Sequence, residues 1–138
     1  MSRGRHLASV LSVCVAAAWL ATSASATAPV KLTDCDRAAT RPRQVLLSCG
    51  DGNAFLRSLR WSSFGGSTAK ATGTLVVNTC EPDCADGRDH SYAVAVTAAS
   101  PRTCRGGTRV YDKLSLRFVS EAPADAGDLR RWTLGCPA

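Results

Sequence analysis

The sequence predicts a small all-β fold: an antiparallel sandwich or partly open barrel of about six strands, stapled by disulfides. Several segments alternate apolar and polar residues with the two-residue period of a half-buried strand. Glycine, proline and asparagine interrupt these segments at short intervals, as turns require. Six cysteines follow an N-terminal segment typical of an export signal, and this combination indicates disulfides formed in an oxidising compartment.

A secretory signal peptide is predicted over residues 1–26. A short basic head precedes the apolar residues 7–20, and Ala24, Ser25 and Ala26 offer the small side chains that a signal peptidase reads. The apolar stretch is shorter than the roughly 20 residues that span a bilayer, so a cleaved signal is favoured over a membrane anchor. We expect Sec-type export, cleavage after Ala26 and a single secreted β domain over residues 27–138, without a membrane span.

Removal of this segment discards Cys14 and lowers the net charge from +6 to +4, because it contains two arginines and no acidic residue. A mildly basic monomer of this size is not a nucleic-acid-binding composition, and we expect no nucleic-acid partner. The grouped arginines are interpreted as solvated faces. They are Arg41 and Arg43; Arg102, Arg105 and Arg109; and Arg130 and Arg131.

The first expected strand contains Val45, Leu47 and Cys49 at alternate positions. Residues 49–53 (CGDGN) then form a compact reversal, because glycine and asparagine tolerate the positive φ of tight turns. This context favours a turn role for Asp51 over a catalytic one.

A second strand is expected near residues 55–64. Phe55, Leu59 and Trp61 would share one face, whereas Leu56 would point the other way. Phe55 and Leu59 would also fit one turn of a helix, but the flanking glycines limit the length of the segment and favour a strand.

The remaining four strands are expected around four apolar patterns. These are the run Leu75 to Val77, covered on both sides; Tyr92, Val94 and Val96; Val110, Leu114, Leu116 and Phe118; and Trp132, Leu134 and Cys136. Proline and glycine predict loops at residues 79–90, 101–107 and 122–127.

Six cysteines allow fifteen pairings, and the sequence does not select one. Because a meander brings chain neighbours together, we expect the sequential pairs Cys35–Cys49, Cys80–Cys84 and Cys104–Cys136. Zinc would need a second close Cys or His pair beside Cys80 and Cys84, and His90 is the only histidine after the signal. The acidic residues of the 79–90 loop lack calcium-loop spacing, so we expect no metal and no cofactor.

Catalytic chemistry has little support. A lone His90 excludes a two-histidine nuclease, and no nucleophile-elbow motif surrounds a serine. Carboxylate pairs for glycoside cleavage stay open, because their separation in space is not readable from the sequence. We expect a protein that is not an enzyme.

Two groups of residues are candidate binding surfaces. Trp61 and Phe64 would form either core or an exposed aromatic platform, with core favoured. Arg102 and Arg105, beside Cys104, could enter the acidic pocket of a trypsin-like protease if the protein were a secreted inhibitor, although no inhibitor-family motif is present.

Residues 42–100 contain the motifs LSCGDG, LRWSSFG and NTCEPDCADG. With these motifs the chain resembles a group of small secreted actinobacterial proteins, except that Phe64 stands where a second tryptophan would be expected. The resemblance implies export and a β fold and supplies no activity. The leading hypothesis is therefore a non-catalytic secreted or envelope-associated domain that binds an extracellular partner through disulfide-held loops; the alternative is a proteinase inhibitor.

Overall fold

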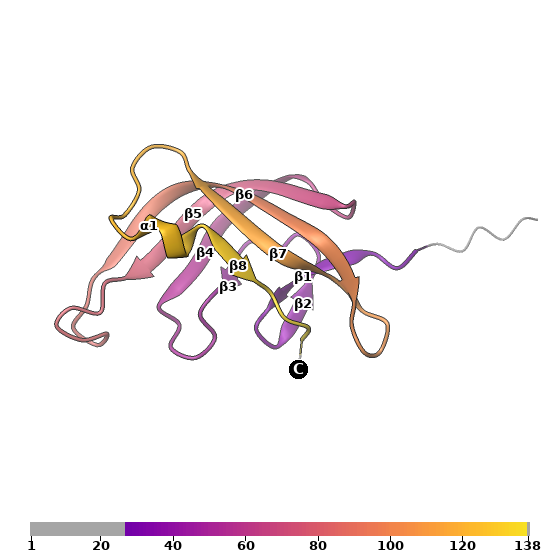
Figure 1. Cartoon of the computed structure of the whole chain (residues 1–138), viewed down its shortest axis with the longest axis horizontal. Coiled ribbons are helices and arrows are strands. Elements are labelled where there is room, and N and C mark those ends of the chain that lie inside the picture. Colours follow the sequence, from indigo (N-terminus) through magenta and orange to yellow (C-terminus); the bar gives the residue numbers. More distant parts are fainter. Residues whose placement is uncertain (1–26, 138) are drawn as a thin grey trace, which may run out of the picture.

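The computed structural model describes residues 27–137, which form one curled β-sheet with a single helical turn. Figure 1 shows the long strands arching over the short ones, in the manner of a half-barrel. The elements are β1 Val30–Asp34, β2 Arg37–Ala39, β3 Val45–Leu46, β4 Ala54–Ser63, β5 Thr68–Asn78, β6 Asp89–Thr103, β7 Arg109–Phe118, α1 Ala126–Leu129 and β8 Arg131–Thr133.

The sheet order is β2-β1-β7-β6-β5-β4-β3, with β8 pairing beside β1 on the outer edge of β7. From β3 to β7 every pairing is an antiparallel neighbour contact, which is the predicted meander. The predicted small all-β, disulfide-stapled fold is thus confirmed. Of the two predicted architectures, the sandwich and the partly open barrel, the structure has the partly open barrel, because the described part of the chain forms one curled sheet.

The number of strands differs from the prediction because β1 and β2 were not expected. β1 has five residues and pairs with β7 in parallel, through Val30 and Lys31. A parallel pairing has no hairpin turn next to it, so the sequence carries no local signal for it. Val30 and Leu32 are nevertheless fully buried in the core.

The predicted shared face of Phe55 and Leu59 in β4 is wrong, whereas Leu59 and Trp61 both face the core, as expected of residues on one face. Leu56 and Leu59 are both buried, although three positions separate them, and Phe55 points to the opposite face from Leu56. The cause is a β-bulge between Arg57 and Arg60, where Ser58 adopts a φ of 55° and reverses the alternation.

Gly73 of β5 makes this bulge possible from the opposite strand. A Cβ at Gly73 would lie 2.8 Å from Cδ2 of Leu59 and 3.0 Å from the carbonyl oxygen of Arg57. A side chain there would therefore push the bulge away from the sheet.

The predicted strand over residues 45–49 is shorter than expected. Only Val45 and Leu46 pair as a strand, because the amides of Leu47 and Ser48 both donate to the carbonyl of Ala54. The predicted reversal at residues 49–53 follows, with Gly52 at a φ of 72°.

The core lies on the concave side of the sheet. The inward residues of β6 and β7 alternate as predicted. In β5 the adjacent Leu75 and Val76 are both buried, as predicted for a strand covered on both sides, and Trp132 and Leu134 beside β8 share a face as predicted. The largest fully buried side chain is Tyr111, whose hydroxyl donates to the Gly66 carbonyl (3.0 Å) and accepts from the Gly65 amide (2.9 Å). Burial of this hydroxyl is thus compensated, and the β4–β5 turn is fastened to β7.

The free edges of the curled sheet meet at β1 and β3 without a strand ladder between them. The amide of Leu46 in β3 donates to Oδ1 of Asp34 in β1 at 2.7 Å. The adjacent Cys35 and Cys49 form a disulfide with a Cα–Cα distance of 5.7 Å. A side chain and a covalent bridge together close the seam that backbone pairing leaves open.

Candidate functional site

Three disulfides join the pairs predicted from the sequence. Cys104–Cys136 ties the end of β6 to the C-terminal segment, and Cys35–Cys49 lies at the β1–β3 seam. Cys80–Cys84 has a different setting, because it lies in the loop that joins β5 and β6 and fastens no other element of the sheet. Residues 79–88 form this loop, which is called the Cys80–Cys84 loop below.

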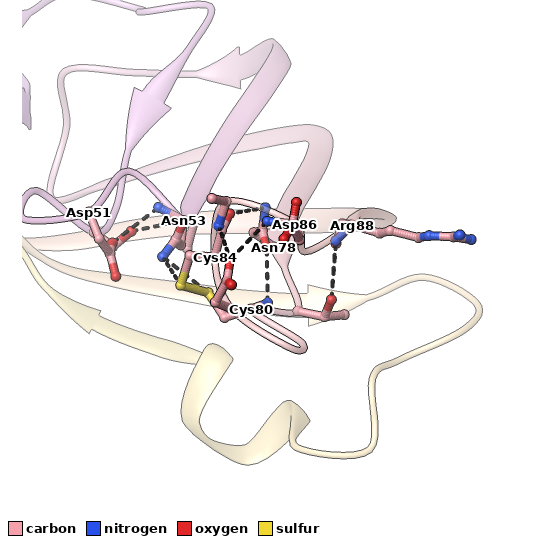
Figure 2. Close-up of a disulfide and its surroundings, with 12 residues drawn as sticks. Asp51, Asn53, Asn78, Cys80, Cys84, Asp86 and Arg88 are labelled. Carbon is pink, nitrogen blue, oxygen red and sulfur yellow. Dashed lines mark hydrogen bonds between the residues drawn. A yellow bond between two sulfur atoms is a disulfide. The ribbon is translucent and has the colours of Figure 1, made fainter.

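The Cys80–Cys84 loop is built around two side-chain acceptors, Asn78, which is labelled in Figure 2, and Asp83. Oδ1 of Asn78 accepts from the amide of Cys80 at 2.8 Å. Oδ1 of Asp83 accepts from the amides of Ala85 and Asp86 at 2.9 and 3.0 Å. Asn and Asp favour such turns because their short side chains reach backbone amides two or three residues on.

Gly87 allows the two halves of the loop to approach each other. A Cβ there would collide with Oδ1 of Asn78 and would lie 2.8 Å from the amide nitrogen of Cys80. The backbone amide of Thr79 donates a hydrogen bond of 3.0 Å to the carbonyl of Arg88 and closes the base of the loop. The loop therefore has a defined shape although nearly all of its residues are exposed.

The neighbouring β3–β4 turn supports the disulfide. Nδ2 of Asn53 lies 3.2 and 3.1 Å from Sγ of Cys80 and Cys84 (Figure 2), and the Asn53 carbonyl accepts from the amide of Asn78 at 2.9 Å. Asp51 holds this turn, since its Oδ1 accepts from the amide of Asn53 at 3.1 Å. Two hydrogen bonds lower the pKa of Asp51 below its ordinary value: the larger effect comes from the Asn53 amide and the next from the Ser48 side chain. The carboxylate has the turn role favoured by the sequence.

A hollow of about 290 Å³ lies beside the Cys80–Cys84 loop. Val77, Tyr92 and Leu129 supply apolar surface, and Glu81, His90 and Asp125 supply polar groups. Mixed linings of this kind suit small ligands or the side chains of a partner. No sequence signal places Asp125 and Leu129 near His90, because they reach the hollow from the far end of the chain.

The hollow brings a histidine and two acids together without the contacts of a catalytic set. In the part of the chain that the structure describes, the His90 side chain takes part in no ion pair and no hydrogen bond. A general base is oriented by such a bond to a neighbour and lies within reach of its nucleophile. Between residues 27 and 137, no group of three or more His, Cys, Asp or Glu residues is arranged to hold a metal ion.

A second hollow, of about 560 Å³, opens at the β1–β3 seam. It is lined by Asp34, Cys35, Asp36, Arg37, Gln44 and Leu46. Asp34 already accepts the Leu46 amide and lies 3.8 Å from Arg37, so its carboxylate is occupied by structural contacts.

Trp61 and Phe64 are half-buried and pack against the core. Their rings meet edge to face, with centroids 4.8 Å apart and planes at 85°, and Phe64 makes the same kind of contact with Tyr111. The Trp61 indole donates to the carbonyl of Pro42 at 2.8 Å. Perpendicular rings do not present the flat surface that stacking on a sugar requires, so the geometry favours core over platform.

Arg102 and Arg105 do not lie on one extended loop. Arg102 is in β6, where Nε lies 3.2 Å from Oδ1 of Asp112 and a guanidinium nitrogen lies 3.3 Å from Sγ of Cys136. Arg105 is exposed in a tight turn closed by the bond from the Cys104 amide to the Thr108 carbonyl, at 2.8 Å. A protease reads an extended segment with a free side chain, and neither arginine is offered in that form.

Comparison with known proteins gives no relative: no family model, curated protein or solved structure matches the chain. Among residues 27–137 no helix has the length and apolar character to cross a bilayer. The predicted signal peptide, residues 1–26, lies outside the described residues.

Proposed function

We propose that this chain is exported and that its mature domain is a non-catalytic binding module, which contacts an extracellular or envelope partner through the Cys80–Cys84 loop and the hollow beside it. The observation that carries the proposal is the construction of this loop. It is exposed, yet its own disulfide, two side-chain turns and a close-packed glycine fix its shape. A pre-formed loop loses little conformational entropy on binding, which is the physical advantage of such a design.

The absence of catalysis is part of the proposal and is supported by the roles of the carboxylates. Asp34 accepts the Leu46 amide at the β1–β3 seam, and Asp51 and Asp83 accept backbone amides in turns. Asp112 forms ion pairs with Arg102 and Lys113. These carboxylates have structural partners in the folded domain. Glu81 and Asp125 line the hollow and are the acids proposed to meet the partner.

The test compares retention of envelope components by three immobilised proteins: the mature domain, a Glu81→Ala/Asp125→Ala variant and an Asp36→Ala/Asp128→Ala control. All four positions are exposed, so folding should be unaffected, and both double variants lose the same charge. We expect retention by the mature domain and the control and loss by the hollow variant. Equal retention by all three would assign binding to another surface, and hydrolysis of an envelope polymer by the mature domain would refute the non-catalytic proposal.

A further inference from the structure

We infer that the convex face of the sheet is a binding surface for a linear polyanion that lacks nucleobases. The face is defined by five exposed cations on four strands: Arg57, Arg60, Lys70, Arg117 and Arg131. It is called the basic face below. It is separate from the Cys80–Cys84 loop, and the inference does not rest on the function proposed for that loop.

The strand register gathers these cations on one side of the sheet. Lys70 lies opposite Thr97, Thr97 opposite Ser115, and Ser115 opposite Arg131, so one row crosses four strands. Because directly paired residues in a sheet point to the same face, the side chains of this row all point away from the core.

A second row lies one pair of residues further along the strands. It contains Arg60, Thr72, Ala95 and Arg117, and Arg57 lies opposite Thr74 in the row beyond it. The bulge at Ser58 determines this arrangement, since it returns Arg60 to the outer face on which Arg57 already lies.

The charge on this face is uncompensated. The ion pairs of the described residues are Arg37–Asp34, Arg102–Asp112 and Lys113–Asp112, and none includes a cation of the basic face. No acidic residue lies in the rows from Thr68 to Thr74 of β5 or opposite them on β6, β7 and β8. Like charges held together repel one another, and a bound anion removes that repulsion.

The centre of the face is hollowed. Lys70, Thr97, Ser115 and Arg117, together with Ala95 and the backbone around them, line a shallow depression of about 350 Å³. Alanine, threonine and serine leave room between the cations, and the hydroxyls can donate to anionic oxygens. A ligand can thus lie against the sheet and remain within reach of the longer cationic side chains.

The spacing indicates a polymer in place of a small anion. Three strand steps of about 4.8 Å separate the backbones of Lys70 and Arg131, which gives about 14 Å across the row. A single phosphate or carboxylate cannot contact both ends, whereas a chain with repeated anionic groups can. No aromatic side chain belongs to these rows, so the stacking platform that single-stranded nucleic acids use is missing.

The experiment measures binding of the mature domain to inorganic polyphosphate and to poly-glutamate by fluorescence anisotropy, at 50 and 200 mM salt. The test variant is Lys70→Glu/Arg117→Glu. The control, Arg88→Glu/Arg105→Glu, changes the net charge equally at two exposed loop positions outside the basic face. Circular dichroism checks that both variants are folded.

We expect the Lys70→Glu/Arg117→Glu variant to bind at least roughly 10-fold more weakly, with the control within about 3-fold of the unchanged domain. The slope of log affinity against log salt should fall by about 0.7 for each phosphate that the variant no longer neutralises. The stronger of the two probes identifies the anionic group, and preferential binding of either supports the inference.

Three results would overturn it. These are absence of binding to both polymers at 50 mM salt, equal weakening in the two variants, and tighter binding of single-stranded DNA than of polyphosphate at equal phosphate concentration. The two proposals can fail separately. If the Glu81→Ala/Asp125→Ala variant loses retention of envelope components and the Lys70→Glu/Arg117→Glu variant keeps it, the loop proposal stands whatever the outcome for the basic face.

Discussion

The carboxylate of Asp34 accepts a hydrogen bond of 2.7 Å from the backbone amide of Leu46, joining the first and third strands where the sheet has no ladder. The aspartate takes the place of a backbone carbonyl and satisfies an amide that the open edge would leave unpaired. The half-barrel therefore closes through a contact that no strand pattern encodes.

Asp34→Ala should destabilise the domain by about 1 to 3 kcal/mol, because the partly buried Leu46 amide loses its charged acceptor. The free energy of unfolding in urea measures the effect. Arg37→Ala is the control, since it removes the 3.8 Å contact between Arg37 and Asp34 and leaves the seam bond intact. That exposed contact is worth little, so a comparable loss in the control would show that the ion pair, and not the seam bond, carries the stability.

Gly87→Ala should disorganise the Cys80–Cys84 loop, because the added Cβ would collide with Oδ1 of Asn78 and crowd the amide of Cys80. We expect a loss of about 1 to 3 kcal/mol and faster proteolysis within residues 79–88. Gly50→Ala is the matched control, since nothing lies within 4 Å of a Cβ there and its φ is not positive. Equal proteolysis of the two variants would contradict the close approach at Gly87.

Ser58→Gly should leave the free energy of unfolding unchanged or raise it by up to about 1 kcal/mol. Ser58 adopts a φ of 55°, and glycine adopts this conformation with less steric strain than any other residue. Ser115→Gly, in a regular part of β7, should instead cost about 1 kcal/mol. Thermal unfolding of the two variants tests the bulge. A larger loss at Ser58 than at Ser115 would mean that β4 runs without the bulge.

Removal of the disulfides as Cys→Ala pairs should destabilise the domain in the order of loop length. The separations of 32, 14 and 4 residues predict losses of about 4, 3 and 2 kcal/mol for Cys104–Cys136, Cys35–Cys49 and Cys80–Cys84. Denaturant unfolding under non-reducing conditions gives the order. With excess reductant the differences among the proteins should largely disappear, and their persistence would point to packing effects of the substitutions.

Asp51 should titrate below its ordinary pKa of 3.8, because the Asn53 amide and then the Ser48 side chain stabilise the carboxylate. A pKa lowered by folding contributes stability above the ordinary pKa, and this contribution is lost as pH falls through the lower, folded value. An NMR titration of the Asp51 side chain measures the pKa directly. Ser48→Ala should shift it upward, and an unchanged value would remove the serine from the explanation.

The meander from β3 to β7 could be predicted because its signals are local. Val94 and Val96 alternate with outward residues, and Gly52 supplies the positive φ that its turn requires. Local signals failed where partners are distant in sequence or where the alternation is interrupted. β1 pairs in parallel with a strand some 80 positions later, and the bulge at Ser58 reverses the predicted faces of Phe55 and Leu56.

The candidate site divides in the same way. The disulfide pair Cys80–Cys84 and the turn role of Asp51 follow from short spacings, whereas the meeting of His90 with Asp125 and Leu129 depends on how the C-terminal segment returns to the sheet. The arginine groups noted in the sequence contain residues that are close along the chain, whereas the basic face contains residues brought together by strand pairing. Only Arg131 belongs to both.

The sequence by itself determined the β class and the reversals, because each depends on residues close together in the chain. It left fifteen cysteine pairings open, and the structure has the sequential one that was expected. Only the tertiary structure decided the closure of the barrel seam, the hollow beside His90 and the alignment of Lys70 with Arg131 across four strands. Strand register fixes the alignment of Lys70 with Arg131, whereas the seam and the hollow depend on contacts between separate segments outside any strand ladder. No single segment encodes either kind of contact.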